Sequence, residues 1–324
     1  MLDLAVLKQR QSLPLEAKVA WAKTRIREWA DHYDGDVFES FSGGKDSTVL
    51  LHLVRQVVPD CPAVFCDTGL EFPEIKAFVR TVENVVTVRP AASFLEVVRT
   101  LGYPVVSKDI AKKLWRLRNP SEANAKIRYV IEHGETPDGE PRSKANLLPQ
   151  KWRYLLDAPF NISDRCCDAL KKKPLAKYQR KSGRWPIIGT LAADSRIRTH
   201  AYLAVGGCNA YSATYPKSTP LGIWTEQDVL RYLVETGIDY SAIYGKIVED
   251  AGTLRTTGET RTGCVFCLFG LHMQKGENRI QRLGRTHPQL HRYCLDVVGE
   301  REVLAFMRQP TCPLDGSCGC QREK

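Results

Sequence analysis

The sequence has no apolar run that approaches about eighteen residues, so it predicts no membrane-spanning helix. Its first residues, MLDLAVLKQRQ, lack the cationic start and the long apolar stretch of a secretory signal. It also lacks internal repeats, and acidic residues are fewer than basic ones, 37 against 47. We therefore expect a cytoplasmic protein without a membrane partner, and the net charge of +10 favours an anionic partner.

The 324 residues, 43% hydrophobic and 26% charged, suit one large or two modest globular domains and exclude a disordered chain or a coiled-coil rod. Eleven cysteines in a reducing compartment indicate metal, cluster or redox chemistry rather than disulfides. Residues 165–198 hold ten basic and two acidic side chains, a net charge of +8. Further basic runs occur at 108–118 and 275–292. The three basic segments form either a solvated surface or a positively charged surface that binds a phosphate backbone.

Strands and helices alternate along the first half of the chain. Buried strands are predicted at 37–41, 63–66, 85–88 and 185–189. Helices are predicted at 15–33, 48–58, 93–101 and 225–236, with another that begins near 73. This order predicts an α/β fold with a parallel sheet and helices on both faces. We expect a nucleotide-binding domain at 1–240 with a polar insertion at about 119–148, and a cysteine- and arginine-rich region at 241–324.

The run Ser42-Gly43-Gly44-Lys45-Asp46-Ser47 lies between a predicted strand and a predicted helix. Its glycines let a phosphate approach backbone N–H groups and the positive end of the helix that follows. Lys45 adds a cation, and Ser42 and Ser47 add hydroxyl donors. The spacing matches neither GxxxxGK[ST] nor GxGxxG. The alternative is a tight turn with serine caps.

This run resembles the PP-loop, SGGxDS, of N-type ATP pyrophosphatases, and Asp67-Thr68-Gly69 resembles the DTG of the phosphoadenosine phosphosulfate reductase branch. The similarity continues through 189–198 and 220–232. It implies an adenine nucleotide alpha hydrolase-like sheet, with Lys45 and Asp46 as catalytic candidates and Asp67 and Gly69 on the base and ribose side. The implied nucleotide-binding residues are Ser42, Gly43, Gly44, Lys45, Asp46, Ser47, Asp67, Thr68, Gly69 and Gly189.

Two cysteine motifs stand apart in the sequence, Cys166-Cys167 and the CxxC of Cys264 and Cys267. A CxxC alone fits zinc, a dithiol or an iron–sulfur cluster equally well. The combination resembles the 4Fe–4S site of bacterial adenylylsulfate reductases, which implies these four cysteines as the metal ligands. Zinc and unliganded buried thiols are the alternatives. Cys208 is the substitute for Cys166, and the tail cysteines, Cys312, Cys318 and Cys320, are given no role.

The sequence departs from assimilatory reductases at two places. It lacks their C-terminal Glu-Cys-Gly-(Leu/Ile)-His, and Leu191 stands where they usually have an arginine, two residues after the glycine that matches Gly189. Residues 264–294 are instead similar to relatives in phage genomes and DNA-modification islands, including the ATP pyrophosphatase component of DNA phosphorothioation systems. This resemblance implies ATP-dependent sulfur transfer to nucleic acid, with DNA as the first expectation, and the cofactors ATP, Mg²⁺ and a 4Fe–4S cluster.

Adenylation by ATP turns a poor leaving oxygen of the target into a good one and releases pyrophosphate. Mg²⁺ and Lys45 would stabilise the charge of that pyrophosphate, and a thiolate or persulfide sulfur would then displace AMP. The implied partners are nucleic acid, a cysteine desulfurase as sulfur donor, other modification-system proteins and a second copy in a homodimer. Three alternatives stay open: an adenylylsulfate or phosphoadenylylsulfate reductase-like enzyme, a tRNA thiolation enzyme, and a non-enzymatic nucleic-acid-binding or cluster-sensing module.

Overall fold

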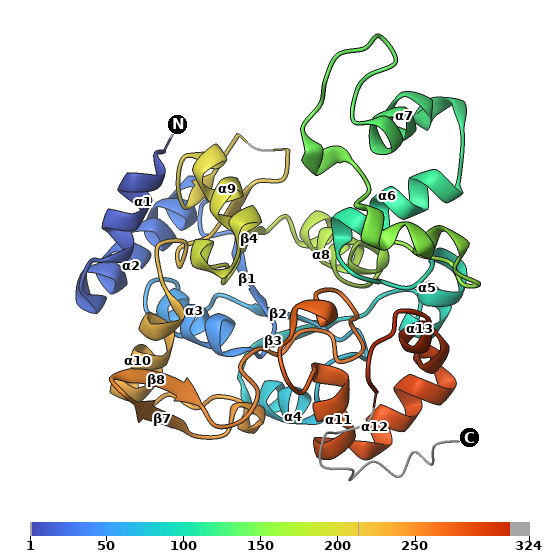
Figure 1. Cartoon of the computed structure of the whole chain (residues 1–324). Coiled ribbons are helices and arrows are strands. Elements are labelled where there is room, and N and C mark those ends of the chain that lie inside the picture. Colours follow the sequence, from blue (N-terminus) through green and yellow to red (C-terminus); the bar gives the residue numbers. More distant parts are fainter. Residues whose placement is uncertain (1, 213, 312–324) are drawn as a thin grey trace. The chain divides into compact units, whose positions relative to one another are not determined.

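The computed structural model of the chain describes residues 2–212 and 214–311 (Figure 1). The chain forms two compact units. The first holds the chain up to Pro90 together with Lys171–Gly263, and the second holds Ala91–Leu170 together with the chain from Cys264 onward. This division differs from the predicted boundary at residue 240, because each unit is assembled from two separate stretches. Among the described residues, no helix is long and apolar enough to cross a membrane.

The first unit is built on a six-stranded sheet with the order β3-β2-β1-β4-β6-β5. Its strands are β1 (Val37–Phe41), β2 (Ala63–Cys66), β3 (Val85–Val88), β4 (Trp185–Ile187), β5 (Asn209–Ala210) and β6 (Lys217–Ser218). All neighbours pair in parallel except β5 and β6. The four predicted strands and their parallel pairing are confirmed. β5 and β6 were not predicted, because two residues are too few to show a period-two pattern.

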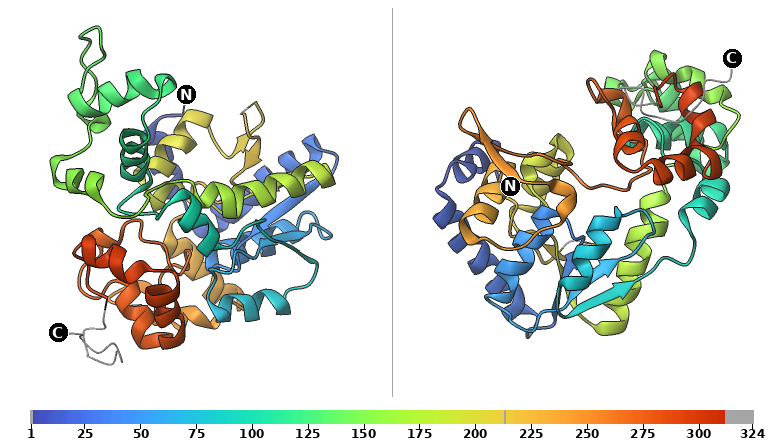
Figure 2. Two further views of the ribbon diagram at one scale, coloured as in Figure 1. Left: turned by 90° about the vertical axis from the view of Figure 1, so that its right-hand side faces the viewer. Right: turned by 90° about the horizontal axis from the view of Figure 1, so that it is seen from below.

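Helices cover both faces of this sheet, as predicted (Figure 2). Successive side chains of a strand point to opposite faces. Val37 of β1 lies in an apolar core with residues of α2 (Leu15–His32) and α3 (Lys45–Arg55). The next residue, Phe38, instead places its ring 5.1 Å from that of Tyr178 in α8 (Lys173–Ser182). The sheet is therefore buried on both sides, which explains why its strands read as nearly continuous apolar runs.

The remaining elements of the first unit surround this sheet. They are α1 (Leu4–Gln11), α4 (Pro73–Thr81), α9 (Arg196–Val205), α10 (Glu226–Thr236) and a hairpin of β7 (Ile247–Asp250) and β8 (Thr253–Thr256). The predicted cap of α10 is confirmed: the Thr225 side chain accepts from the backbone N–H of Asp228, whose carboxylate accepts from the N–H of Thr225. The ammonium of Lys18, in α2, lies 2.7 Å from Asp228 Oδ2 and is buried, so it joins α2 to α10.

The described part of the second unit is mainly helical. Its α-helices are α5 (Phe94–Leu101), α6 (Lys108–Arg118), α7 (Ala125–His133), α11 (Arg279–Thr286), α12 (Pro288–Arg292) and α13 (Glu300–Phe306). The predicted polar insertion therefore contains a helix, α7. Part of the basic run at 108–118 is structural rather than exposed: buried Lys113 donates to the backbone carbonyls of Ala145 and Leu147, and Arg118 donates to those of Ala158 and Phe160.

Candidate active site

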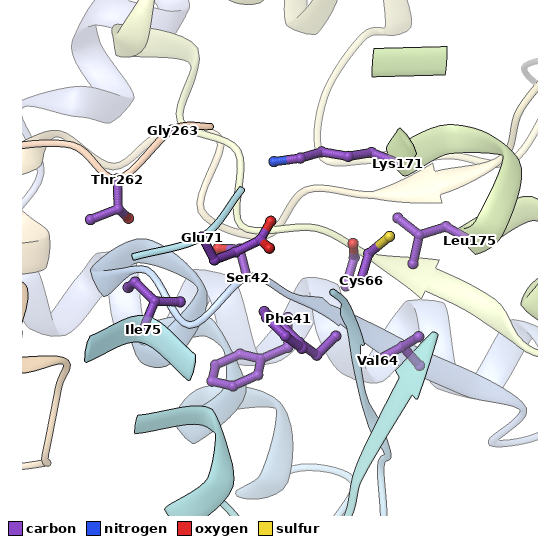
Figure 3. Close-up of a pocket in the computed structure, with 12 residues that line it drawn as sticks. Phe41, Ser42, Val64, Cys66, Glu71, Ile75, Lys171, Leu175, Thr262 and Gly263 are labelled. Atoms are coloured by element: carbon purple, nitrogen blue, oxygen red, sulfur yellow. The ribbon is translucent and has the colours of Figure 1, made fainter. Parts of the chain in front are cut away.

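A pocket lies in the first unit at the carboxyl ends of β1 and β2 (Figure 3). The strand order reverses between β1 and its other neighbour, β4, and open α/β sheets bind ligands at the carboxyl ends of their strands near such a reversal. The enclosed space of the pocket is about 80 Å³, which is small beside the roughly 300–1,000 Å³ of small-molecule sites. Its lining residues are Ser40, Phe41, Ser42, Val64, Phe65, Cys66, Glu71, Ile75, Lys171, Leu175, Thr262 and Gly263.

The predicted phosphate loop, Ser42–Ser47, joins β1 to α3 at this pocket. Gly43 has a φ of +69°, and a Cβ there would lie 2.8 Å from Val79 Cγ2 and 2.9 Å from Ile75 Cγ2. Only glycine fits this turn without strain. The hydroxyls of Ser42 and Ser47 are 2.9 Å apart, and Ser47 also donates to the carbonyl of Gly44. The loop thus places Ser42 in the wall of the pocket and begins α3 beside it, and the first turn of a helix carries the N–H groups that an anion site requires.

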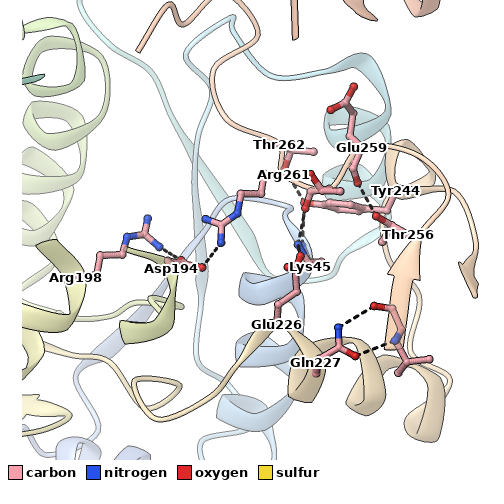
Figure 4. Close-up of polar contacts among 12 residues, drawn as sticks. Lys45, Asp194, Arg198, Glu226, Gln227, Tyr244, Thr256, Glu259, Arg261 and Thr262 are labelled. Atoms are coloured by element: carbon pink, nitrogen blue, oxygen red, sulfur yellow. Dashed lines mark hydrogen bonds and ion pairs between the residues drawn. The ribbon is translucent and has the colours of Figure 1, made fainter. Parts of the chain in front are cut away.

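Lys45 is the first residue of α3, and its side chain is almost fully buried. Its ammonium lies 3.0 Å from Glu226 Oε1 and donates to the carbonyl of Thr260 at 2.6 Å (Figure 4). Its backbone N–H donates to the hydroxyl of Tyr244 at 3.2 Å, and that hydroxyl is 2.7 Å from Thr262 Oγ1. The cation of the loop is therefore held at the start of α3 by residues far along the chain.

Asp46 carries a buried oxygen, Oδ1, with no hydrogen-bond partner among the described residues. Burial raises the pKa of Asp46, and the neighbouring ammonium of Lys45 opposes this only in part, while the Asp194 carboxylate adds to it. Gly189 lies against the backbone of Asp46. A Cβ on Gly189 would be 3.3 Å from the carbonyl carbon of Asp46. The structure thus brings Gly189 beside the loop, in keeping with its predicted place in the site.

The predicted DTG turn, Asp67–Gly69, directly follows β2. Asp67 Oδ1 lies 2.8 Å from the ammonium of Lys76, and burial acts to raise the pKa of Asp67, but the contact with Lys76 and the N–H of Gly69 hold it below its usual value. Thr68 is buried and donates from Oγ1 to Glu71 Oε1 at 2.7 Å. Glu71 lines the pocket whereas none of these three residues does, so their role on the base and ribose side stays a prediction.

The four cysteines predicted as metal ligands all belong to the second unit. The pKa of Cys166 is raised, first by a hydrogen bond with Cys167 and then by burial. The negative charge of the neighbouring cysteines, when they are thiolates, raises it further. Burial, followed by the charge of Cys264, raises the pKa of Cys267 to about 12. Each shift involves the other motif, so Cys166-Cys167 and the CxxC are brought close enough to interact. This donor set of four thiols fits an iron–sulfur cluster or zinc in kind.

Within residues 2–212 and 214–311, no group of three or more His, Cys, Asp or Glu side chains is arranged to hold a metal ion. Metal binding by the four cysteines therefore stays a prediction. Cys208 belongs to the first unit, where it is buried and its sulfur lies 3.3 Å from the hydroxyl of Tyr202, in an apolar core. The tail cysteines, Cys312, Cys318 and Cys320, lie outside the described residues.

Several residues of the site were not predicted from the sequence. Tyr244 contacts the start of α3, Thr262 contacts Tyr244, and Lys171, which belongs to the basic segment 165–198, lines the pocket. Figure 3 shows Lys171 and Glu71 extending toward Ser42 from separate segments. One signal was available in the sequence. Thr262 stands two residues before Cys264 in the run GETRTGC, so the residues that precede the CxxC were candidates for the site.

The sequence model of the phosphoadenosine phosphosulfate reductase domain matches residues 36–268, well over half of the chain. The chain belongs to this family. The match begins just before β1 and ends just after the CxxC, so it includes the phosphate loop, the DTG turn and all four cysteines predicted as ligands. The family resemblance expected from the phosphate loop and the DTG turn is confirmed, whereas kinship with DNA phosphorothioation proteins stays a prediction.

Curated relatives of this family member are sulfonucleotide reductases. The adenosine 5′-phosphosulfate reductase of Anoxybacillus flavithermus is 24% identical over 288 residues, 88% of this chain and 96% of the relative. That of Staphylococcus epidermidis is 24% identical over 233 residues, 72% and 75% respectively. A solved phosphoadenylyl-sulfate reductase from Candida auris, a phosphate complex, gives a TM-score of 0.39 at 14% identity, with 78% of this chain and 98% of that chain covered. Because the curated relatives are enzymes, an enzymatic function of this chain is supported.

Proposed function

We propose that this chain is a sulfonucleotide reductase-like enzyme that acts on adenylylsulfate or phosphoadenylylsulfate. The observation that carries the proposal is the pocket at the carboxyl ends of β1 and β2, which the phosphate loop borders. The reductase relatives that match most of the chain support the same substrate class. The phosphosulfate would bind at the first turn of α3, where N–H groups and Lys45 offer positive charge to an anion.

In this reaction a thiolate attacks the sulfur atom, the bond between sulfur and the phosphate oxygen breaks, and the nucleotide leaves with the negative charge. A second thiol then releases sulfite and forms a disulfide, so electrons and atoms balance. Lys45 and the start of α3 would stabilise the charge on the departing phosphate. Cys166, Cys167, Cys264 and Cys267 would hold a 4Fe–4S cluster, which supplies a thiolate-bound redox centre when present.

One observation favours a second function, ATP-dependent sulfur transfer to nucleic acid. Leu191 is buried in the apolar core, so it gives the pocket no cation at the position where an arginine is usual in the reductases. The orphaned Oδ1 of Asp46 would suit Mg²⁺, which in nucleotide sites needs only one or two carboxylates besides the phosphates. In that case DNA is the first expected target, and a cysteine desulfurase and other modification proteins are the expected partners.

The products formed by the pure, anaerobically handled protein distinguish the two functions. With a dithiol and adenylylsulfate or phosphoadenylylsulfate, we expect sulfite together with AMP or adenosine 3′,5′-bisphosphate, measured by chromatography. The same protein should leave ATP intact. AMP and pyrophosphate from ATP, with no sulfite from either sulfonucleotide, would instead support sulfur transfer. ADP and inorganic phosphate would contradict both functions.

The second function makes a separate prediction about α8. This helix exposes Lys173, Lys177 and Lys181 and carries no acidic residue, so it offers a basic face to a phosphate backbone. Replacing all three with alanine should lower the slope of log affinity for DNA against log salt by about 2 to 3. A triple variant at exposed lysines elsewhere is the matched control: Lys8, Lys126 and Lys144. An unchanged slope in the α8 variant would contradict a nucleic-acid role for this face.

A further inference from the structure

Three residues that directly precede Gly263 and the CxxC lie across the start of α3. We call Thr260–Thr262 the strap. The carbonyl of Thr260 accepts from the Lys45 ammonium at 2.6 Å, and the hydroxyl of Thr262 is 2.7 Å from that of Tyr244. Tyr244 in turn accepts from the backbone N–H of Lys45 at 3.2 Å. The strap and Tyr244 thus occupy the groups that a phosphate would use (Figure 4).

These contacts satisfy the anion site with neutral or internal partners. The N–H of Lys45 belongs to the first turn of α3, where helices present unpaired donors. Its acceptor is a hydroxyl that stays neutral, because burial raises the pKa of Tyr244 to about 12. The ammonium of Lys45 is neutralised by Glu226. Hydrogen bonds to a charged phosphate are about twice as strong as neutral ones, so a nucleotide would compete well with Tyr244 for the N–H of Lys45.

The strap is held differently at its base and at its tip. At the base, in the two residues that precede the strap, the backbone N–H groups of Gly258 and Glu259 donate to the carbonyls of Tyr244 and Ile243 at 2.8 and 2.9 Å. At the tip, the Arg261 guanidinium is ion-paired with Asp194, and both groups lie near Asp46. The base is therefore tied by backbone hydrogen bonds, whereas the tip is held by the Arg261–Asp194 pair and by the Lys45 ammonium, which a bound phosphate would take.

We propose that the strap closes the phosphate site of the nucleotide-free protein and is displaced when a nucleotide binds. This inference rests on the proposed nucleotide site and adds a regulation to it. A bound phosphate takes the N–H and the ammonium of Lys45, so Tyr244 and Thr260 lose their contacts with α3. Because Gly263 and Cys264 follow the strap directly, its release also frees the chain that leads into the CxxC. Substrate binding is thereby linked to the cysteine motif through the backbone.

Limited trypsin digestion measures how accessible the strap is, because trypsin cleaves after arginine and Arg261 lies at the centre of the strap. AMP serves as the probe, since it binds without turnover, and its binding is measured on the same protein by calorimetry. Saturating AMP should increase cleavage after Arg261 by about five-fold, the effect of losing one neutral hydrogen bond of the strap. Mass spectrometry of the fragments identifies the bond. If AMP binds and protects this bond, or binds and leaves its cleavage unchanged, the proposed displacement of the strap is overturned. The nucleotide site is not overturned by that result.

Two variants test the strap by the sign of their effect. Tyr244→Phe removes the hydroxyl that occupies the N–H of Lys45, and Thr262→Val removes the hydroxyl that holds Tyr244 there. Each variant should therefore bind AMP more tightly, by about five-fold, and be cleaved faster without AMP. If these hydroxyls were phosphate ligands, affinity would fall, which would overturn the proposal. Tyr240→Phe is the control, because this hydroxyl bonds the carbonyl of Gly245 instead. A wild type and variants that all fail to bind AMP would overturn the proposed function together with the strap.

Discussion

Replacing Lys45 with methionine is expected to lower kcat/KM for adenylylsulfate by at least about 100-fold, the loss typical of a removed charge-stabilising donor. Methionine keeps the apolar stem in its buried setting but removes the ammonium, which would face the departing phosphate. Glu226, its ion-pair partner, is partly exposed, so water can solvate the carboxylate that the substitution leaves. The measurement is steady-state release of sulfite or AMP, with AMP affinity measured in parallel.

The control for this substitution is Lys8→Met, which changes an exposed lysine of α1 in the same unit. It should leave turnover, AMP affinity and the thermal midpoint at wild-type values. Lys45→Met should also keep the far-ultraviolet circular dichroism of the wild type, since the residue lies at the helix end rather than inside it. Wild-type turnover in Lys45→Met would remove this residue from the site. Lost activity together with lost secondary structure would require the test to be repeated with Lys45→Arg, which retains a cation.

Serine in place of Cys264 or Cys267 is expected to remove most of the iron and the visible iron–sulfur absorption from anaerobically purified protein. The thiols of the two motifs raise one another's pKa values, so the motifs lie near one another, and a metal would bind these cysteines as thiolates. Iron and acid-labile sulfide per chain, together with the visible spectrum, are the readouts. Turnover should fall with them, but the spectrum decides the assignment independently of activity.

Cys208→Ser is the matched control for these substitutions. Cys208 is buried in the first unit beside Tyr202, so its replacement should leave iron content and spectrum unchanged. A loss of iron in this variant alone would make Cys208 a ligand, as the sequence allowed. Wild-type protein with one zinc and no iron would contradict the cluster and favour the structural zinc alternative. Wild-type protein without any metal would leave the four cysteines as unliganded thiols.

Much of the nucleotide-binding part could be predicted because its signals are local. The strands at 37–41, 63–66 and 85–88 have the bounds that their apolar runs predict, and the phosphate loop follows the first of them. Thr225 caps α10 as its sequence pattern predicts. In each case the residues that decide the structure are neighbours in sequence. The resemblance carried by the loop and the DTG turn was also sufficient to predict the family, which the match over 36–268 confirms.

The sequence carried little information on contacts across long separations. The boundary at residue 240 was drawn from composition along the chain, whereas the second unit joins 91–170 to the chain beyond 264. The basic run at 108–118 was interpreted as surface charge, yet Lys113 is buried against carbonyls more than thirty positions away. Lys171, which belongs to the basic segment 165–198, lines the pocket. A basic side chain has the same sequence pattern in both settings, and only packing decides which carbonyls or pockets it can reach.

The sequence by itself determined the parallel sheet, the loop that opens α3 and the family, because apolar periodicity and turn chemistry act between residues close along the chain. Only the tertiary structure decided what the loop contacts. Lys45 meets the carbonyl of Thr260 across 215 positions and the hydroxyl of Tyr244 across 199. No local pattern encodes such a pair, since each partner is positioned by the packing of its own element. The strap over the phosphate site and the approach of the two cysteine motifs arise in the same way.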